Sequence, residues 1–72
     1  MSFQSYLDYI ETRTGRSPAE LHAEARQQGL ADDTGLAPGV KAGAIIDWLK
    51  ADHDLGHGHA MTIVAWIKGK RS

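Results

Sequence analysis

The chain has 72 residues, which is near the lower limit at which one domain buries enough apolar surface to fold without disulfides or metals. Eight Lys and Arg against nine Asp and Glu give a net charge of −1, so no overall positive field attracts nucleic acid or an anionic membrane. Cysteine is absent and no segment approaches the roughly 20 apolar residues that span a membrane, so we expect one soluble, cytoplasmic domain over residues 1–72.

The first half of the chain predicts two helices. A stripe of apolar residues at helical spacing predicts a first helix over residues 3–14, which Ser2 caps and Gly15 ends. The stripe consists of Phe3, Tyr6, Leu7 and Ile10. A second helix begins at "SPAEL", because Ser17 and Glu20 have the spacing of a capping box and Pro18 suits the first helical position.

The middle of the chain predicts a loop followed by a third helix. Gly29 is expected to end the second helix, and residues 31–39 have the Asp, Gly and Pro content of a loop, from which Leu36 is directed into the core. Apolar residues then recur at helical spacing and predict a helix over residues 40–53. Gly43 within it suggests that another backbone or a ligand comes close.

A turn at Gly56–Gly58 separates the third helix from a fourth, in which Ala60, Ile63, Val64 and Ile67 form the same apolar stripe. The cations of "KGKRS" suit the C-terminus of that helix. No segment predicts a strand. The expected fold is therefore all-α, a compact bundle of four short helices.

Three blocks of the sequence carry a resemblance to a known family. The opening "MSFQSYLDYIETRTGRSPAEL", the middle "PGVKAGAIIDWLK" and the closing "LGHGHAMTIVAWIK" together resemble the small bacterial family labelled Domain of Unknown Function 4287. The resemblance implies a compact helical domain, alone or joined to another domain, without a settled activity. His53 and Thr62 depart from the family's pattern, which usually has an aromatic and a small residue there, so His53 is a poor candidate for shared chemistry.

The histidines near "LGHGHAM" raise the question of a metal site. His53, His57 and His59, with Asp52 and Asp54, offer ligands that zinc or nickel accepts. However, the intervening glycines are expected to break the helix, so no pair of histidines is held one turn apart on one helical face. We therefore expect no metal site.

The same stretch offers little for catalysis. A general base needs a nucleophile or an oriented carboxylate beside it, and the sequence has no cysteine, no Gly-x-Ser-x-Gly motif and no recognisable acid pair. We therefore expect a non-enzymatic protein without a cofactor.

Anion binding is a further interpretation of this stretch. Free amides at a helix start attract phosphate, and "LGHGHAMT" is similar to the Gly-x-Gly turn of helix-hairpin-helix proteins, which binds the DNA backbone. The low net charge weighs against tight DNA binding, so a local cationic patch would be needed. The candidate binding residues are Lys41, Gly56, His57, Gly58, His59 and Lys68, and further cations are Lys50, Lys70 and Arg71.

The alternative is that Gly56 and Gly58 serve only a sharp turn, with His59 bonded to a free amide or packed on Trp48. Between these alternatives we favour a non-enzymatic binding or accessory module with the Gly56–His59 turn as its functional surface; phosphate-backbone binding is the competing hypothesis. The expected partner is an unknown protein or a second copy in a weak homodimer, at a face that includes Trp66.

Overall fold

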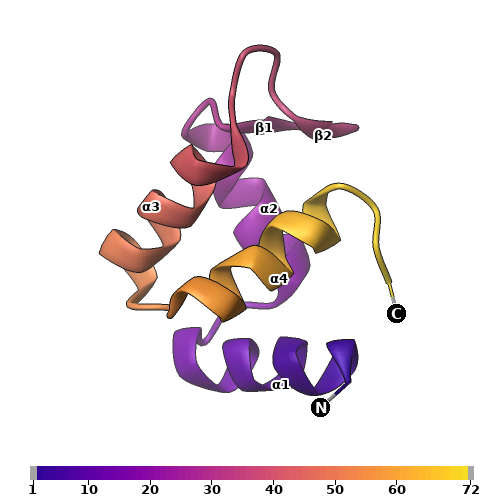
Figure 1. Cartoon of the computed structure of the whole chain (residues 1–72), viewed down its shortest axis with the longest axis vertical. Coiled ribbons are helices and arrows are strands. Elements are labelled where there is room, and N and C mark those ends of the chain that lie inside the picture. The colour runs from indigo at the N-terminus through magenta and orange to yellow at the C-terminus, as the bar shows by residue number, and fades with distance from the viewer. Residues whose placement is uncertain (1, 72) are drawn as a thin grey trace.

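The computed structural model describes residues 2–71 and contains four helices and a small antiparallel sheet (Figure 1). The elements in chain order are α1 (Phe3–Thr14), α2 (Pro18–Gln27), β1 (Ala31–Asp32), β2 (Gly35–Leu36), α3 (Ala42–His53) and α4 (His57–Ile67). The mostly helical fold with four helices is as predicted. None of the helices in residues 2–71 has the length and apolar character needed to cross a membrane.

The first two helices begin at the caps that the sequence predicts. The Ser2 side chain accepts a hydrogen bond from the Ser5 amide at the start of α1. At the start of α2, the Ser17 hydroxyl accepts from the Glu20 amide while the Glu20 carboxylate accepts from the Ser17 amide. Each of these bonds satisfies an amide that has no partner within the helix.

The segment after α2 is a β-hairpin, so the prediction of a loop without strands is wrong. Ala31 pairs with Leu36, and Asp32 pairs with Gly35, across a two-residue turn. The Asp32 carboxylate accepts hydrogen bonds from both the amide and the hydroxyl of Thr34, which fixes the turn. The predicted inward position of Leu36 is confirmed, because its side chain is half-buried against the core.

Helix α3 begins at Ala42, two residues later than the periodicity suggests. The chain reverses at Gly39, which has a φ of 80°, and Lys41 is still extended. The expected close approach of a backbone to Gly43 is wrong: beyond its own helix, no heavy atom lies within 4 Å of the place that a side chain would take.

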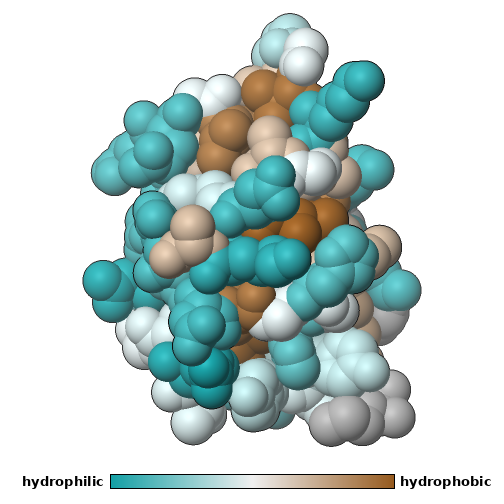
Figure 2. All heavy atoms as spheres, turned by 60° about the vertical axis from the view of Figure 1, so that its left-hand side comes forward, coloured by the Kyte–Doolittle hydropathy of each residue, from teal (hydrophilic) through white to brown (hydrophobic). Residues whose placement is uncertain are grey.

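Helix α4 is the centre of the molecule and contacts α1, α2 and α3 (Figure 1). No Asp, Glu, Lys or Arg occurs in its sequence, and a helix that is apolar on most sides is stable only when neighbours cover it. The largest fully buried side chains come from all four helices: Ile10, Leu21, Ile45, Leu49 and Ile63. On the side that carries α3, polar side chains cover much of the surface and hydrophobic ones show between them (Figure 2).

Candidate binding groove

The turn between α3 and α4 depends on Asp54 rather than on the glycines. Asp54 is left-handed, with a φ of 54°, whereas Gly56 is extended with a φ of −69° and Gly58 lies inside the first turn of α4. Leu55, between them, is buried and its amide donates to the Leu49 carbonyl. The prediction that Gly56 and Gly58 make a sharp turn is therefore wrong, and α4 begins at His57.

Asp54 also ties this turn to α1. The Arg13 guanidinium donates to the Asp54 carboxylate over 2.7 Å and to the Asp54 carbonyl over 3.2 Å. The hydrogen bond that Arg13 donates to the Asp54 carboxylate is the main cause that raises the pKa of Arg13 above its usual value. Both side chains are exposed to solvent, so the pair orients the turn more than it stabilises the fold.

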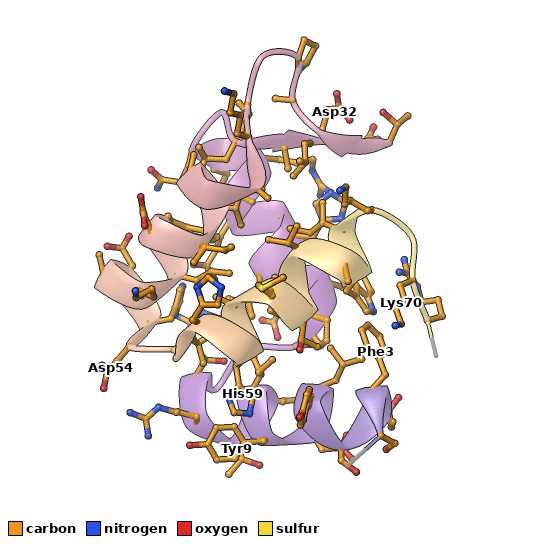
Figure 3. All side chains as sticks on the ribbon, in the orientation of Figure 1. Phe3, Tyr9, Asp32, Asp54, His59 and Lys70 are labelled. Atoms are coloured by element: carbon orange, nitrogen blue, oxygen red, sulfur yellow. The ribbon has the colours of Figure 1, made fainter. Side chains whose placement is uncertain are left out.

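His59 holds the start of α4 against α1. Its ring stacks on Tyr9, with centroids 4.5 Å apart and 29° between the planes, and meets the Tyr6 ring edge-on at 5.3 Å (Figure 3). Aromatic pairs at these separations contribute attraction beyond the area they bury. The expected packing of His59 on Trp48 is wrong, because Trp48 contacts His53 instead.

The other histidines face different parts of the fold. His53 Nε2 lies 2.9 Å from a Glu24 carboxylate oxygen, His22 Nε2 lies 2.8 Å from the Asp32 carbonyl, and His57 is exposed. Within residues 2–71, no three His, Cys, Asp or Glu side chains are grouped so that they could hold a metal ion.

The two predicted lysines are not beside the α3–α4 turn. Lys41 precedes the first residue of α3 and Lys68 follows the last residue of α4, so each is separated from the turn by a whole helix. At a rise of about 1.5 Å per residue, that separation is roughly 16–18 Å. Gly56 provides no side-chain cap for the first amides of α4. Phosphate binding by these amides stays a prediction, but Lys41 and Lys68 do not lie beside them as expected.

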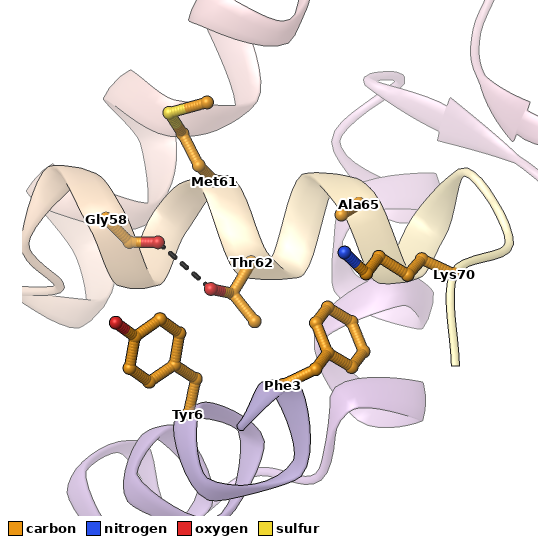
Figure 4. A pocket seen from close by; sticks show the side chains of 7 residues that line it. All are labelled: Phe3, Tyr6, Gly58, Met61, Thr62, Ala65 and Lys70. Carbon is orange, nitrogen blue, oxygen red and sulfur yellow. Dashed lines mark hydrogen bonds between the residues drawn. The ribbon is translucent and has the colours of Figure 1, made fainter. Parts of the chain in front are cut away.

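The structure contains an open groove of about 310 Å³ between α1 and α4. Phe3 and Tyr6 line it from α1, and Lys70 lines it from the residues after α4 (Figure 4). The lining residues contributed by α4 are Gly58, Met61, Thr62 and Ala65. Of the six predicted binding residues, Gly58 alone belongs to this lining.

Small side chains on α4 leave the groove open. Gly58, Thr62 and Ala65 follow one another at helical spacing along the groove, and Thr62 points toward the two aromatic rings of α1 (Figure 4). The Thr62 hydroxyl donates to the Gly58 carbonyl over 3.0 Å, so its proton is used within the helix. In the middle of the groove this hydroxyl can therefore act only as an acceptor.

The end of α4 places Lys70 at the groove. Gly69 has a φ of 115°, and the Lys70 amide donates back to the Ala65 carbonyl, a helix ending that reverses the chain. The Lys70 ammonium then lies 5.2 Å from the centre of the Phe3 ring (Figure 3). Within residues 2–71, no carboxylate lies within 4.0 Å of this ammonium.

The neighbouring Arg71 covers Trp66. Its guanidinium lies 3.8 Å from the centre of the Trp66 ring and donates to the Trp66 carbonyl. Trp66 is half-buried, and His22 meets it on another side. The chain itself thus covers the face at which a second protein was expected, and self-association there stays a prediction.

The groove was missed because helical spacing assigns Phe3 and Tyr6 to the core. Both are half-buried, whereas Leu7 and Ile10 of the same stripe are fully covered. The sequence signal for the groove is the combination of small residues at successive turns of α4 with a glycine just before Lys70. This signal predicts a groove only when α1 and α4 are known to be neighbours.

Comparison with known proteins identifies a family but no characterised relative. A family described as "Domain of unknown function (DUF4287)" matches residues 2–69. No curated protein and no solved structure gave a significant match. The match covers the four helices and the hairpin, and the chain belongs to the family described as Domain of unknown function DUF4287.

Proposed function

We propose that this domain is a non-enzymatic binding module whose binding surface is the α1–α4 groove. The observation that carries the proposal is an open depression lined by two aromatic rings, small residues of α4 and one ammonium group. Ligand sites in proteins are concave and combine apolar side chains with a few polar groups. Their volumes start at about 300 Å³. The groove has this size, and apolar and polar groups both line it, so it is suited to a small ligand or to one side chain of a partner.

A binding role agrees better with the lining than an enzymatic one. Among the described residues that line the groove there is neither a carboxylate nor a histidine, and the Thr62 hydroxyl is already bonded to the Gly58 carbonyl. Tyr6 and Lys70 are the lining residues that could transfer a proton, and no hydrogen bond joins them, whereas acid–base or nucleophilic catalysis needs its groups within hydrogen-bonding reach of one another.

The test uses an apolar, uncharged probe and the isotope-labelled chain. Titration with 4-phenylbutyramide is expected to shift the amide resonances of Gly58, Thr62 and Ala65 in a saturable way. An Ala65→Phe variant fills the groove and should abolish these shifts. An Ala51→Phe variant makes the same change at an exposed position of α3, outside the lining, and should keep them.

Two results would contradict the proposal. One is the absence of saturable shifts at the groove in the unmodified chain. The other is equal binding by the Ala65→Phe and Ala51→Phe variants, which would place the probe elsewhere on the molecule.

A further inference from the structure

The groove carries a formal charge at one end only, and this asymmetry points to a class of ligand. The inference rests on the proposed function, because it concerns the same groove. Phe3, Tyr6, Met61 and Ala65 present rings, a thioether and a methyl group, with one uncharged hydroxyl on Tyr6, whereas Lys70 presents an ammonium (Figure 4). A ligand that matches both parts has an apolar body and an acceptor group at one end.

The charge of that acceptor group follows from the surroundings of Lys70. Its ammonium lies over the Phe3 ring and has no carboxylate partner within residues 2–71. A cation beside an aromatic face keeps its hydrogen-bonding capacity for a further partner, since the ring interacts with the charge and occupies no strong acceptor site. An anionic oxygen of a ligand would be a stronger acceptor than the water around this exposed side chain.

A single negative charge fits the groove better than a phosphate dianion. The nearby cation Arg71 does not line the groove: its guanidinium lies on the Trp66 ring and donates through Nη1 to two backbone carbonyls. Lys70 therefore acts as one point charge without the fork that binds phosphate in a bidentate manner. A second negative charge beside the apolar lining would lose hydration without gaining a partner.

We infer that the α1–α4 groove binds amphipathic monocarboxylates, with the apolar body against Phe3, Tyr6 and Met61 and the carboxylate on the Lys70 ammonium. The aromatic rings give the groove its affinity for the body of the ligand. Lys70 gives the preference for the acid over uncharged molecules of the same shape.

A matched pair of probes separates the two contributions. 4-Phenylbutyrate and 4-phenylbutyramide have the same size and differ in charge, and their dissociation constants are measured from amide shifts of Gly58 and Ala65. The acid is expected to bind about two- to five-fold more tightly, the range of a solvent-exposed ion pair. In Lys70→Gln the two constants should become equal, and Lys70→Arg should restore a difference.

Lys68→Gln is the control, because it removes the same charge from the same end of α4 at a residue outside the groove lining. It is expected to keep the preference for the acid, and 1 M salt should reduce that preference in the unmodified chain. Equal binding of acid and amide at the groove, or a preference that survives in Lys70→Gln, would overturn the inference while the binding function stands. Binding of neither probe would overturn both.

Discussion

Asp54 shows how a single backbone conformation sets the angle between two helices. The residue is left-handed at the end of α3, a position at which glycine is the common choice because it has no Cβ. Aspartate tolerates this conformation better than most residues, and here its carboxylate and carbonyl both accept from Arg13. The glycines that follow it in the sequence adopt ordinary backbone angles.

Replacing Asp54 by glycine or by alanine tests this conclusion. Both variants remove the carboxylate, so the contact with Arg13 through that group is lost equally and cancels in the comparison. Asp54→Gly should be more stable than Asp54→Ala by about 1 kcal/mol, because only alanine retains the strain of a Cβ in the left-handed region. Urea unfolding of the two variants measures the difference, and equal stabilities would contradict the assigned conformation.

Gly56 and Gly58 should respond in opposite ways to the same change. Gly58 lies within the first turn of α4 with open space around it, so Gly58→Ala should stabilise the fold by up to about 1 kcal/mol. Gly56 is the N-cap, where alanine is poorer than glycine, so Gly56→Ala should destabilise by about 0.5 kcal/mol. Thermal unfolding of the two variants distinguishes these signs. A loss of stability in Gly58→Ala would restore the view that this glycine is needed for the turn.

At the level of elements, the caps were predictable and the hairpin was not. The Ser17–Glu20 capping box and the reversal at Gly29 depend on residues within one or two turns, so their sequence pattern determines them. The hairpin has a two-residue turn without the Asn-Gly or Asp-Gly pair that usually marks one. Its signal is weaker: Asp32 at the first and Gly35 at the fourth position of the turn.

The hairpin turn should weaken in acid. Hydrogen bonds from the Thr34 hydroxyl, and secondarily from its amide, lower the pKa of Asp32 below its usual value. A folded-state pKa below the unfolded value means that the stabilisation is complete above the unfolded pKa, about 3.9, and is lost as the pH falls through the folded pKa. Carboxyl NMR titration should show the pKa of Asp32 rising toward its usual value in Thr34→Val, but not in Thr34→Ser. An unchanged pKa in Thr34→Val would contradict the role of the hydroxyl.

At the scale of the whole molecule, α1 and α4 pack against each other in the core, and their surface contacts at His59 and at Lys70 lie on either side of an open groove. His59 stacks on Tyr9 at one end, and Lys70 lies over Phe3 at the other, so the helices run in opposite directions (Figure 3). The small residues of α4 leave the space between these contacts unfilled, which produces the groove. Sequence periodicity predicted both helices. It could not predict that they pack against each other, because this pairing brings together residues that are far apart in the chain.

The position of a bound probe tests the central claim most directly, because it shows whether the α1–α4 groove is the binding surface. Nuclear Overhauser effects are measured between 4-phenylbutyramide and the labelled chain. We predict contacts from the phenyl protons of the probe to the Met61 methyl group and to the Phe3 and Tyr6 rings. Contacts confined to other surfaces, such as the Trp48 side chain on α3, or no contacts at saturating probe, would contradict the account.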